Sequence, residues 1–158
     1  MAQPETTIVM NDRIYQAIVA GFVGGCLSVL VFHQLFIWAM TQAGWLNGTV
    51  YSTRTIPPFG VPQIVSQAFW GGLWGIVFAF VVPRLSAPFD GVLGGFLFGL
   101  VCPTLVAWLV VAPLRGQPLG NGFRMPGLVT TPLIQAVFGL GVMVFIALIC
   151  KLFSWKWS

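Results

Sequence analysis

Four long apolar stretches dominate this chain of 158 residues and leave little room for anything else. They run over Ala17–Met40, Val61–Val82, Phe89–Ala112 and Leu133–Phe153. Each is long enough to cross a hydrocarbon core of about 30 Å, which takes about 20 helical residues. Only 6% of the residues are charged, whereas soluble domains carry about 25%. The sequence therefore predicts an all-α, polytopic membrane protein: a single membrane domain over residues 1–158 with four transmembrane helices.

The first and third stretches are similar at a constant offset of 70 residues. Nine of the 22 positions in Ala17–Trp38 are identical in Ala87–Trp108. In the first copy these are Ala17, Gly21, Gly24, Gly25, Leu27, Leu30, Val31, Leu35 and Trp38. A repeat that holds two spans keeps its orientation, so its copies are related by a pseudo-twofold axis along the membrane normal. We therefore expect a tandem repeat of two helical hairpins, approximately 15–82 and 85–153.

Glycines recur at spacings of three or four residues along the apolar stretches. Small residues at this spacing let helix backbones approach closely in lipid, where the hydrophobic effect cannot drive association. We expect the following glycines to pack helices together: Gly21, Gly25, Gly72, Gly75, Gly91, Gly95 and Gly99. They predict close helix–helix contacts, called glycine seams below, inside one bundle. Part of this small-residue surface could instead pack against a second protomer or another subunit.

His33 and Gln34 form a strongly polar pair inside the first stretch, and His33 is the chain's single histidine. Ionisable residues in a membrane are costly and are functional candidates by default. A neutral His33 could hydrogen-bond across the bundle, to Gln67, Gln135 or a loop carbonyl. It could also relay protons, because its unperturbed pKa is about 6.5, or ligate a haem or chlorophyll-type pigment.

The repeat breaks at this pair, because the equivalent positions are Pro103 and Thr104. A proline inside a helix clashes with the carbonyl four residues back, here that of Gly99. We expect a kink there, with Thr104 or a neighbour satisfying the freed group. The six residues predicted to form one polar layer are His33, Gln34, Gln67, Pro103, Thr104 and Gln135.

Two connections of about 20 residues, Thr41–Gly60 and Pro113–Pro132, are expected on the same side of the membrane. Each carries an arginine at the repeat position, Arg54 or Arg124. Such loops cap the bundle end, line an entrance or dock a partner. Four lysines and arginines lie with the termini against three on the loop side, which favours cytoplasmic termini under the positive-inside rule.

The run PPFGVPQIVSQAFWGGLWGIVFA at Pro57–Ala79, together with Phe32-His33-Gln34, resembles a group of small four-helix inner-membrane proteins of proteobacteria. The resemblance covers both helices of the first half and the loop between them. It implies a multi-pass protein of the bacterial inner membrane with the same four-span layout. It implies no activity.

The sequence lacks the combinations of residues that an enzyme's active site needs. A second histidine, a carboxylate pair in the spans and a nucleotide-binding loop are all absent from the sequence. Basic residues lie scattered at the ends of the stretches, which argues against nucleic acid as a partner. We expect no catalytic activity and no cofactor, with the bilayer and other membrane subunits, or a second copy, as partners.

Three functions remain open. The first is an accessory or assembly subunit of a larger, energy-transducing membrane complex. The second is a small homo-oligomeric channel or transporter for an ion or solute. The third is a haem- or pigment-binding membrane protein that uses His33.

Overall fold

The computed structural model describes residues 4–56, 60–114 and 116–155, and these are helical apart from the loops and one short pair of strands. Four helical segments in this part are long and apolar enough to cross a membrane. They are Asp12–Gln42, Gln63–Arg84, Val92–Leu114 and Gly127–Leu152. The predicted all-α architecture, with four helices long and apolar enough to span a membrane, is confirmed.

Two of the four spans contain a π-helical turn. The first consists of α1 (Pro4–Ser28), the π-helical turn η1 (Val29–His33) and α2 (Gln34–Gln42). The third consists of α4 (Val92–Val106), the π-helical turn η3 (Ala107–Val111) and α5 (Ala112–Leu114). The second span is α3 (Gln63–Val81) followed by the 3₁₀ turn η2 (Val82–Arg84), and the fourth is α6 (Gly127–Leu152).

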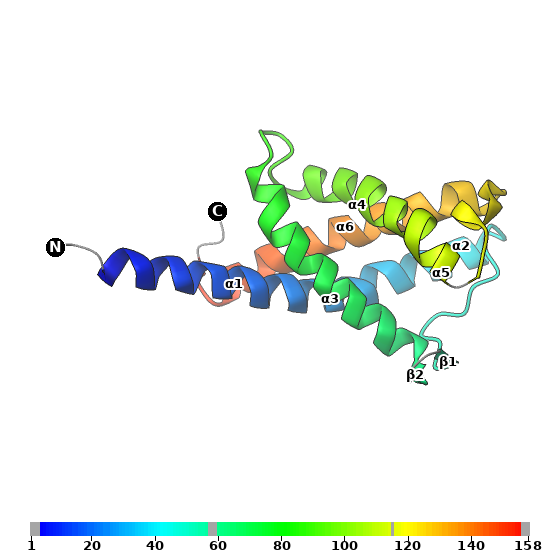
Figure 1. The fold of residues 1–158 in the computed structure, drawn as a ribbon, viewed down its shortest axis with the longest axis horizontal. Coiled ribbons are helices and arrows are strands. Elements are labelled where there is room, and N and C mark those ends of the chain that lie inside the picture. Colours follow the sequence, from blue (N-terminus) through cyan, green and yellow to red (C-terminus); the bar gives the residue numbers. More distant parts are fainter. Residues whose placement is uncertain (1–3, 57–59, 115, 156–158) are drawn as a thin grey trace.

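The two long loops contain only short regular elements. In the first, β1 (Thr55–Ile56) pairs antiparallel with β2 (Val61–Pro62). In the second, the 3₁₀ turn η4 (Leu119–Phe123) precedes α6. Both loops lie at the same end of the bundle, and the start of α1, the end of α6 and the connection between η2 and α4 lie at the other (Figure 1). Consequently α1 and α4 run in one direction, and α3 and α6 run in the other.

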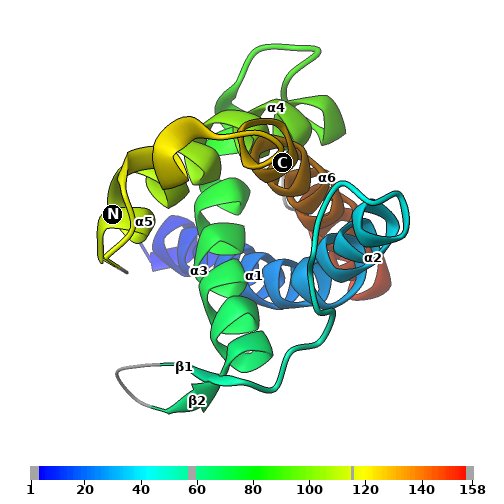
Figure 2. The same cartoon turned by 90° about the vertical axis from the view of Figure 1, so that its right-hand side faces the viewer.

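The helices pack mainly in three pairs: α1 with α3, α4 with α6, and α1 with α6. Figure 2 shows the bundle along its axis, with α3 crossing the other spans at a steep angle. A buried apolar cluster joins the pairs, with Phe78 of α3 and Val142, Met143 and Ile146 of α6 at its centre. The α3 and α4 helices touch through Phe98 of α4, whose ring contacts those of Trp74 and Phe78. Beyond this contact they diverge toward the loop side (Figure 1).

Glycines bring α1 and α3 into backbone contact. A Cβ on Gly21 would lie 2.7 Å from the carbonyl oxygen of Gly75, and one on Gly25 would overlap the carbonyl of Gly71. On the other side of this seam, a Cβ on Gly72 would overlap the ring of Phe22. The space that a side chain would occupy is therefore filled by the opposite helix.

A second glycine seam joins α4 to α6. A Cβ on Gly99 would overlap the carbonyl of Gln135, and one on Gly95 would overlap the side chain of Met143. Gly139 completes this seam from the α6 side, because its own Cβ would overlap the carbonyl of Gly95. Gly91 differs from the other predicted packing glycines: it is the N-cap of α4, and nothing lies within 4 Å of its Cβ position.

The fourth helix begins six residues earlier than its apolar stretch suggests. Pro132 lies inside α6, which starts at Gly127. The N–H groups of Val129 and Thr130 both donate to the carbonyl of Pro126, 3.0 Å away. With its first turn satisfied in this way, the helix forms before the proline and loses only the bond that Pro132 cannot donate.

We predict that Gly25→Ala destabilises the protein by about 1–3 kcal/mol, the usual effect of overfilling a packed interior. The added methyl group would overlap the backbone of Gly71, which cannot move aside as a side chain can. The free energy of unfolding, measured in mixed micelles, tests this. Gly127→Ala is the matched control, since its Cβ meets open space; equal stabilities of the two variants would contradict the role of the seam.

Candidate functional site

Gln34 points toward α3, whereas a regular α-helix through residues 25–34 would turn it away from α3. It follows Gly25 by nine residues, which on a regular α-helix is a rotation of about 180° away from the side that faces α3. In the structure Gln34 is only 2% exposed. The π turn η1 immediately before it accounts for the difference, because one extra residue in a helix turns everything after it back by about 100°.

Gln34 uses its amide to join two helices and a loop. Its Oε1 accepts a hydrogen bond of 2.8 Å from the backbone N–H of Tyr51. That bond fixes the orientation of the amide, because a backbone N–H can only donate. The Nε2 group then donates to Oε1 of Gln67 on α3, at 3.3 Å. Both ends of the buried amide are thus satisfied by the chain itself.

Tyr51 makes a second contact, with the π turn itself. The backbone N–H of Gln34 donates to the carbonyls of Val29 and Val31, and not to that of Leu30, the usual partner four residues back. The hydroxyl of Tyr51 donates to the Leu30 carbonyl at 2.6 Å. A carbonyl displaced from the regular helical pattern therefore receives its hydrogen bond from the loop, as burial in a membrane requires.

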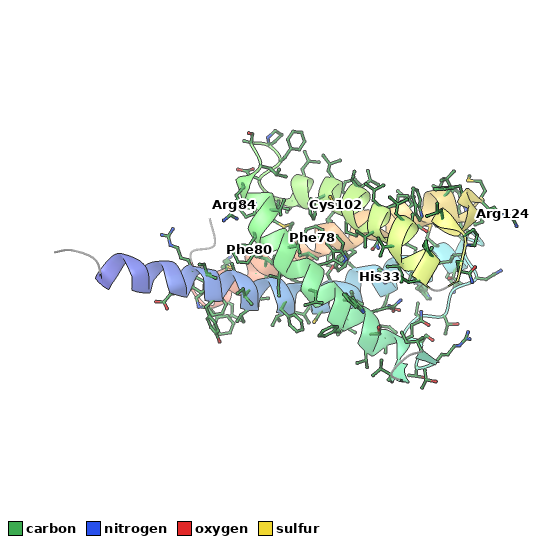
Figure 3. The ribbon with its side chains drawn as sticks, viewed as in Figure 1. His33, Phe78, Phe80, Arg84, Cys102 and Arg124 are labelled. Atoms are coloured by element: carbon green, nitrogen blue, oxygen red, sulfur yellow. The ribbon has the colours of Figure 1, made fainter. Side chains whose placement is uncertain are left out.

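His33 is the last residue of the π turn and lies within the bundle between α3 and the second hairpin (Figure 3). Its Nδ1 lies 3.5 Å from Nε2 of Gln34. No hydrogen bond to its Nε2 occurs in the described part of the chain. One ring nitrogen is thus positioned by a neighbour, and the other is free for a ligand or water.

The six polar-layer residues fall into two groups. His33, Gln34 and Gln67 come together in the first hairpin. The other three lie in the second hairpin: Pro103 and Thr104 on α4, and Gln135 on α6. Among the described residues, no hydrogen bond joins the two groups.

Pro103 and Thr104 are both buried, and α4 continues through them to Val106. The hydroxyl oxygen of Thr104 is buried and has no hydrogen-bond partner. It therefore does not satisfy the carbonyl that Pro103 releases at Gly99. The sequence correctly places a polar group beside the proline but does not predict that this group is left unpaired.

The loop arginines lie on the surface, at the loop end of the bundle. Arg54 and Arg124 both have exposed side chains, and Figure 3 labels Arg124 at that end. The carbonyl of Arg54 accepts the N–H of Gln63 at 2.9 Å, and that of Ser52 accepts the N–H of Ile64 at 3.0 Å. The first loop therefore supplies hydrogen-bond acceptors for the first turn of α3.

Sequence reasoning missed Tyr51. It is a single tyrosine in a loop, and no pattern in the sequence marks it. Only the backbone conformation marks Tyr51 as unusual, since its φ is positive, at 50°. A positive φ is uncommon for a residue other than glycine and persists where surrounding contacts hold it, here two hydrogen bonds to the first span.

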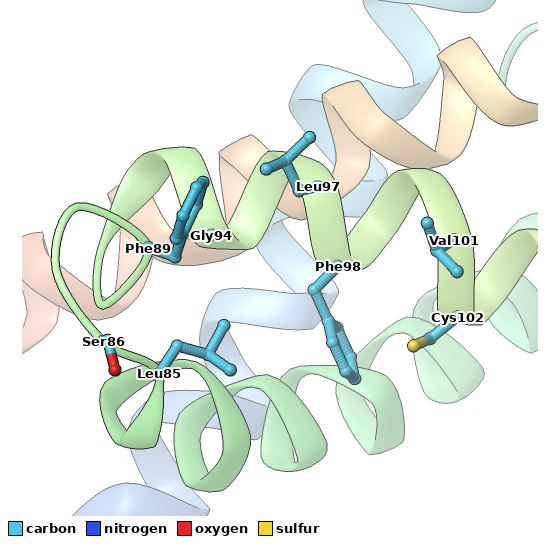
Figure 4. Close-up of a pocket in the computed structure, with 8 residues that line it drawn as sticks. All are labelled: Leu85, Ser86, Phe89, Gly94, Leu97, Phe98, Val101 and Cys102. Carbon is cyan, nitrogen blue, oxygen red and sulfur yellow. The ribbon is translucent and has the colours of Figure 1, made fainter.

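A shallow groove lies between the η2 end of α3 and α4 (Figure 4). Its lining residues are Leu85, Ser86, Phe89, Gly94, Leu97, Phe98, Val101 and Cys102. Apart from the Ser86 hydroxyl and the Cys102 thiol, the lining is apolar. It holds no arrangement of acids, bases or ligands that could perform chemistry.

No group of three metal-ligating side chains occurs within the described residues. Pro57–Phe59, part of the run that resembles small inner-membrane proteins, lie outside them. No protein-family model, curated protein or solved structure matches this chain.

We predict that Gln34→Leu lowers the free energy of unfolding by about 2–4 kcal/mol, because it leaves the Tyr51 N–H and the Gln67 amide without a partner. Denaturant titration in mixed micelles measures the change. Gln42→Leu is the control, since the exposed Gln42 side chain makes no hydrogen bond to the described chain. A loss no larger than that of the control would mean that the amide network contributes nothing to stability.

Proposed function

We propose that this chain is a non-catalytic membrane subunit that assembles with other membrane proteins through the outer face of α3. In this proposal it is an accessory or assembly subunit of a larger complex in a bacterial inner membrane, with cytoplasmic termini. The resemblance of the first half to small inner-membrane proteins and the distribution of basic residues support this location and orientation.

The observation that carries the proposal is an exposed aromatic pair on α3. Phe69 is 51% and Trp70 60% exposed, and their rings make an edge-to-face contact with centroids 5.9 Å apart. Trp70 is the eighth of the 22 residues in its span, so it lies about 5 Å along the helix from the middle. Tryptophans on lipid-facing surfaces are enriched at the membrane–water interfaces. With the span centred in the bilayer, this one would lie well inside the hydrocarbon region.

The indole N–H of Trp70 supports a protein partner over lipid. Tryptophan has one donor and no acceptor in its side chain, and the described residues offer this donor no hydrogen bond. Acyl chains offer none either, whereas a neighbouring helix can supply a carbonyl or hydroxyl. Tryptophan is also among the residues that most often dominate the binding energy of protein interfaces.

The polar contacts inside the first hairpin agree with a structural role. Gln34 directs its amide oxygen at Tyr51 and its amide nitrogen at Gln67. A pathway for a polar solute needs groups that can exchange partners, whereas these are committed to the fold. Likewise the glycine seams are used within the chain, which leaves larger apolar side chains on the outside.

The tandem repeat is part of the proposal and is supported by the depth of the glycine contacts. Gly25 meets Gly71 in the first hairpin. At the 70-residue offset, Gly95 should meet position 141, and it contacts Gly139 and Met143 on either side of that position.

The two hairpins differ in the face that their second helix presents. Gly141 is the repeat equivalent of Gly71, but it packs against Ser28 and Phe32 of the first span. We infer that the two halves share a register along the membrane normal, while α6 is turned about its own axis relative to α3. This turn lets α6 contact both α1 and α4.

A photo-crosslinking experiment tests the α3 face. A photoreactive phenylalanine analogue at position 70 should crosslink to a different membrane protein in cells. The same analogue at Leu105, exposed near the middle of the α4 span, is the matched control and should react mainly with lipid. Trp70→Leu should reduce copurification of that partner at least tenfold, with an unchanged yield of folded protein.

The other outcomes decide against the proposal. Crosslinks from position 70 to lipid alone would show that the aromatic pair has no partner. Crosslinks to a second copy of the chain would replace the accessory subunit with a homo-oligomer.

A homo-oligomeric channel or transporter is the second candidate, because the free Nε2 of His33 and the unpaired hydroxyl of Thr104 are polar groups that the fold does not use. We predict that in this case His33→Leu abolishes flux in reconstituted vesicles while the protein stays folded, since the ring donates and accepts along the path. Flux assays with Gln42→Leu vesicles as the control measure this. A wild-type flux in the His33→Leu protein would exclude His33 from transport, and an absorption band lost in the same variant would instead indicate a pigment or haem ligand.

A further inference from the structure

We propose that Tyr51 and Gln34 together form a latch that holds the π turn of the first span, and that lifting the first loop releases α2 to rotate by about 100°. The latch consists of two hydrogen bonds made by one loop residue. The Tyr51 hydroxyl reaches the Leu30 carbonyl at 2.6 Å, and its backbone N–H reaches the Gln34 amide at 2.8 Å.

Each bond stabilises a different part of the same distortion. The extra residue of the π turn takes the Leu30 carbonyl away from its regular partner, the N–H of Gln34. The same extra residue turns the Gln34 side chain from the lipid side to the α3 side. Tyr51 satisfies the displaced carbonyl and the turned amide at once, so the distortion has no unpaired group while the loop is in place.

Without the loop, the regular helix becomes the competing arrangement. The Gln34 N–H then returns to the Leu30 carbonyl, and α2 turns as a unit by the angle of one residue. With the loop in place, Leu35 is 60% and Trp38 51% exposed, while Phe36 and Ile37 are partly buried. After the rotation Ile37 takes the direction that Trp38 now has, and Leu35 takes that of Phe36.

The loop is tied to α3, which gives the latch a way to be moved. Carbonyls of Ser52 and Arg54 accept the N–H groups of Ile64 and Gln63 at the start of α3. Tyr51 immediately precedes this pair, so a displacement of the start of α3 also displaces Tyr51. A partner that binds the loop end of α3 would thereby change the surface that α2 presents to the bilayer.

Spin labels placed singly at positions 35 to 38 in bilayers report this rotation through their collision rate with oxygen. The background replaces the three cysteines, Cys26, Cys102 and Cys150, with alanine. We expect maxima at 35 and 38 in this background and in Gln34→Leu alone, because the Tyr51 hydroxyl still holds the Leu30 carbonyl. In the double variant Gln34→Leu with Tyr51→Phe, the maximum at 38 should move to 37 and the rate at 35 should fall.

Two controls separate the latch from general damage. The pair Tyr15→Phe with Gln42→Leu makes the same chemical changes at exposed positions and should leave the maxima at 35 and 38. Deleting Val31 from the double variant removes the extra residue of the π turn. A regular helix then gives α2 its present orientation, so the collision rates should again be highest at 35 and 38, as in the background.

The proposal is overturned if the double variant keeps its maximum at 38, or if the Val31 deletion moves it. Should the double variant lose folded protein, the Val31 deletion must restore the folded yield, because a regular helix leaves the Leu30 carbonyl satisfied. A yield that stays low after the deletion would also overturn the latch.

Discussion

The contact between the backbones of α1 and α3, through Gly25 and Gly71, is the constraint on which the other features of the first hairpin depend. Water is not available to drive apolar surfaces together inside a bilayer, so close approach and polar contacts between helices have to do so. At this separation the Gln34 amide can reach Gln67, and the Cys26 thiol can reach the carbonyl of Ala68 at 3.2 Å. A wider spacing would leave these buried groups unpaired.

The same approach explains why the polar residues divide between the two hairpins. Each glycine seam joins helices within one hairpin, so residues at one depth meet within their own pair. The two pairs are joined by α1 and α6, where the Ser28 hydroxyl donates to the carbonyl of Phe138 at 2.6 Å. In the described part of the chain, no hydrogen bond joins His33 to Thr104.

The four spans and most of the glycine contacts could be predicted because they depend on patterns of neighbouring residues. Hydrophobic length gives the spans, and the spacing of Gly21 and Gly25 gives a flat helix face. The π turn could not be predicted, because no proline or glycine interrupts Val29–His33, and the extra residue is stabilised by Tyr51, which lies 18 residues beyond the turn. The direction of the Gln34 side chain, which follows the turn, depends on that distant contact. The start of α6 differs from the start of the apolar stretch for a local reason, since the N–H groups of Val129 and Thr130 donate to the Pro126 carbonyl and the helix forms before Pro132.

The hydrogen bonds from Gln63 and Ile64 to the loop carbonyls bear on how this protein fits bilayers of different thickness. A helix with free amides at its start must place that end where water or lipid headgroups can solvate it. Here two of those amides are already satisfied by the preceding loop, so α3 can begin below the headgroups without a further penalty at these two positions. Hydrophobic mismatch at this end is then absorbed by the vertical position of a folded loop and helix start, with less need for α3 to tilt or for the bilayer to thin around it.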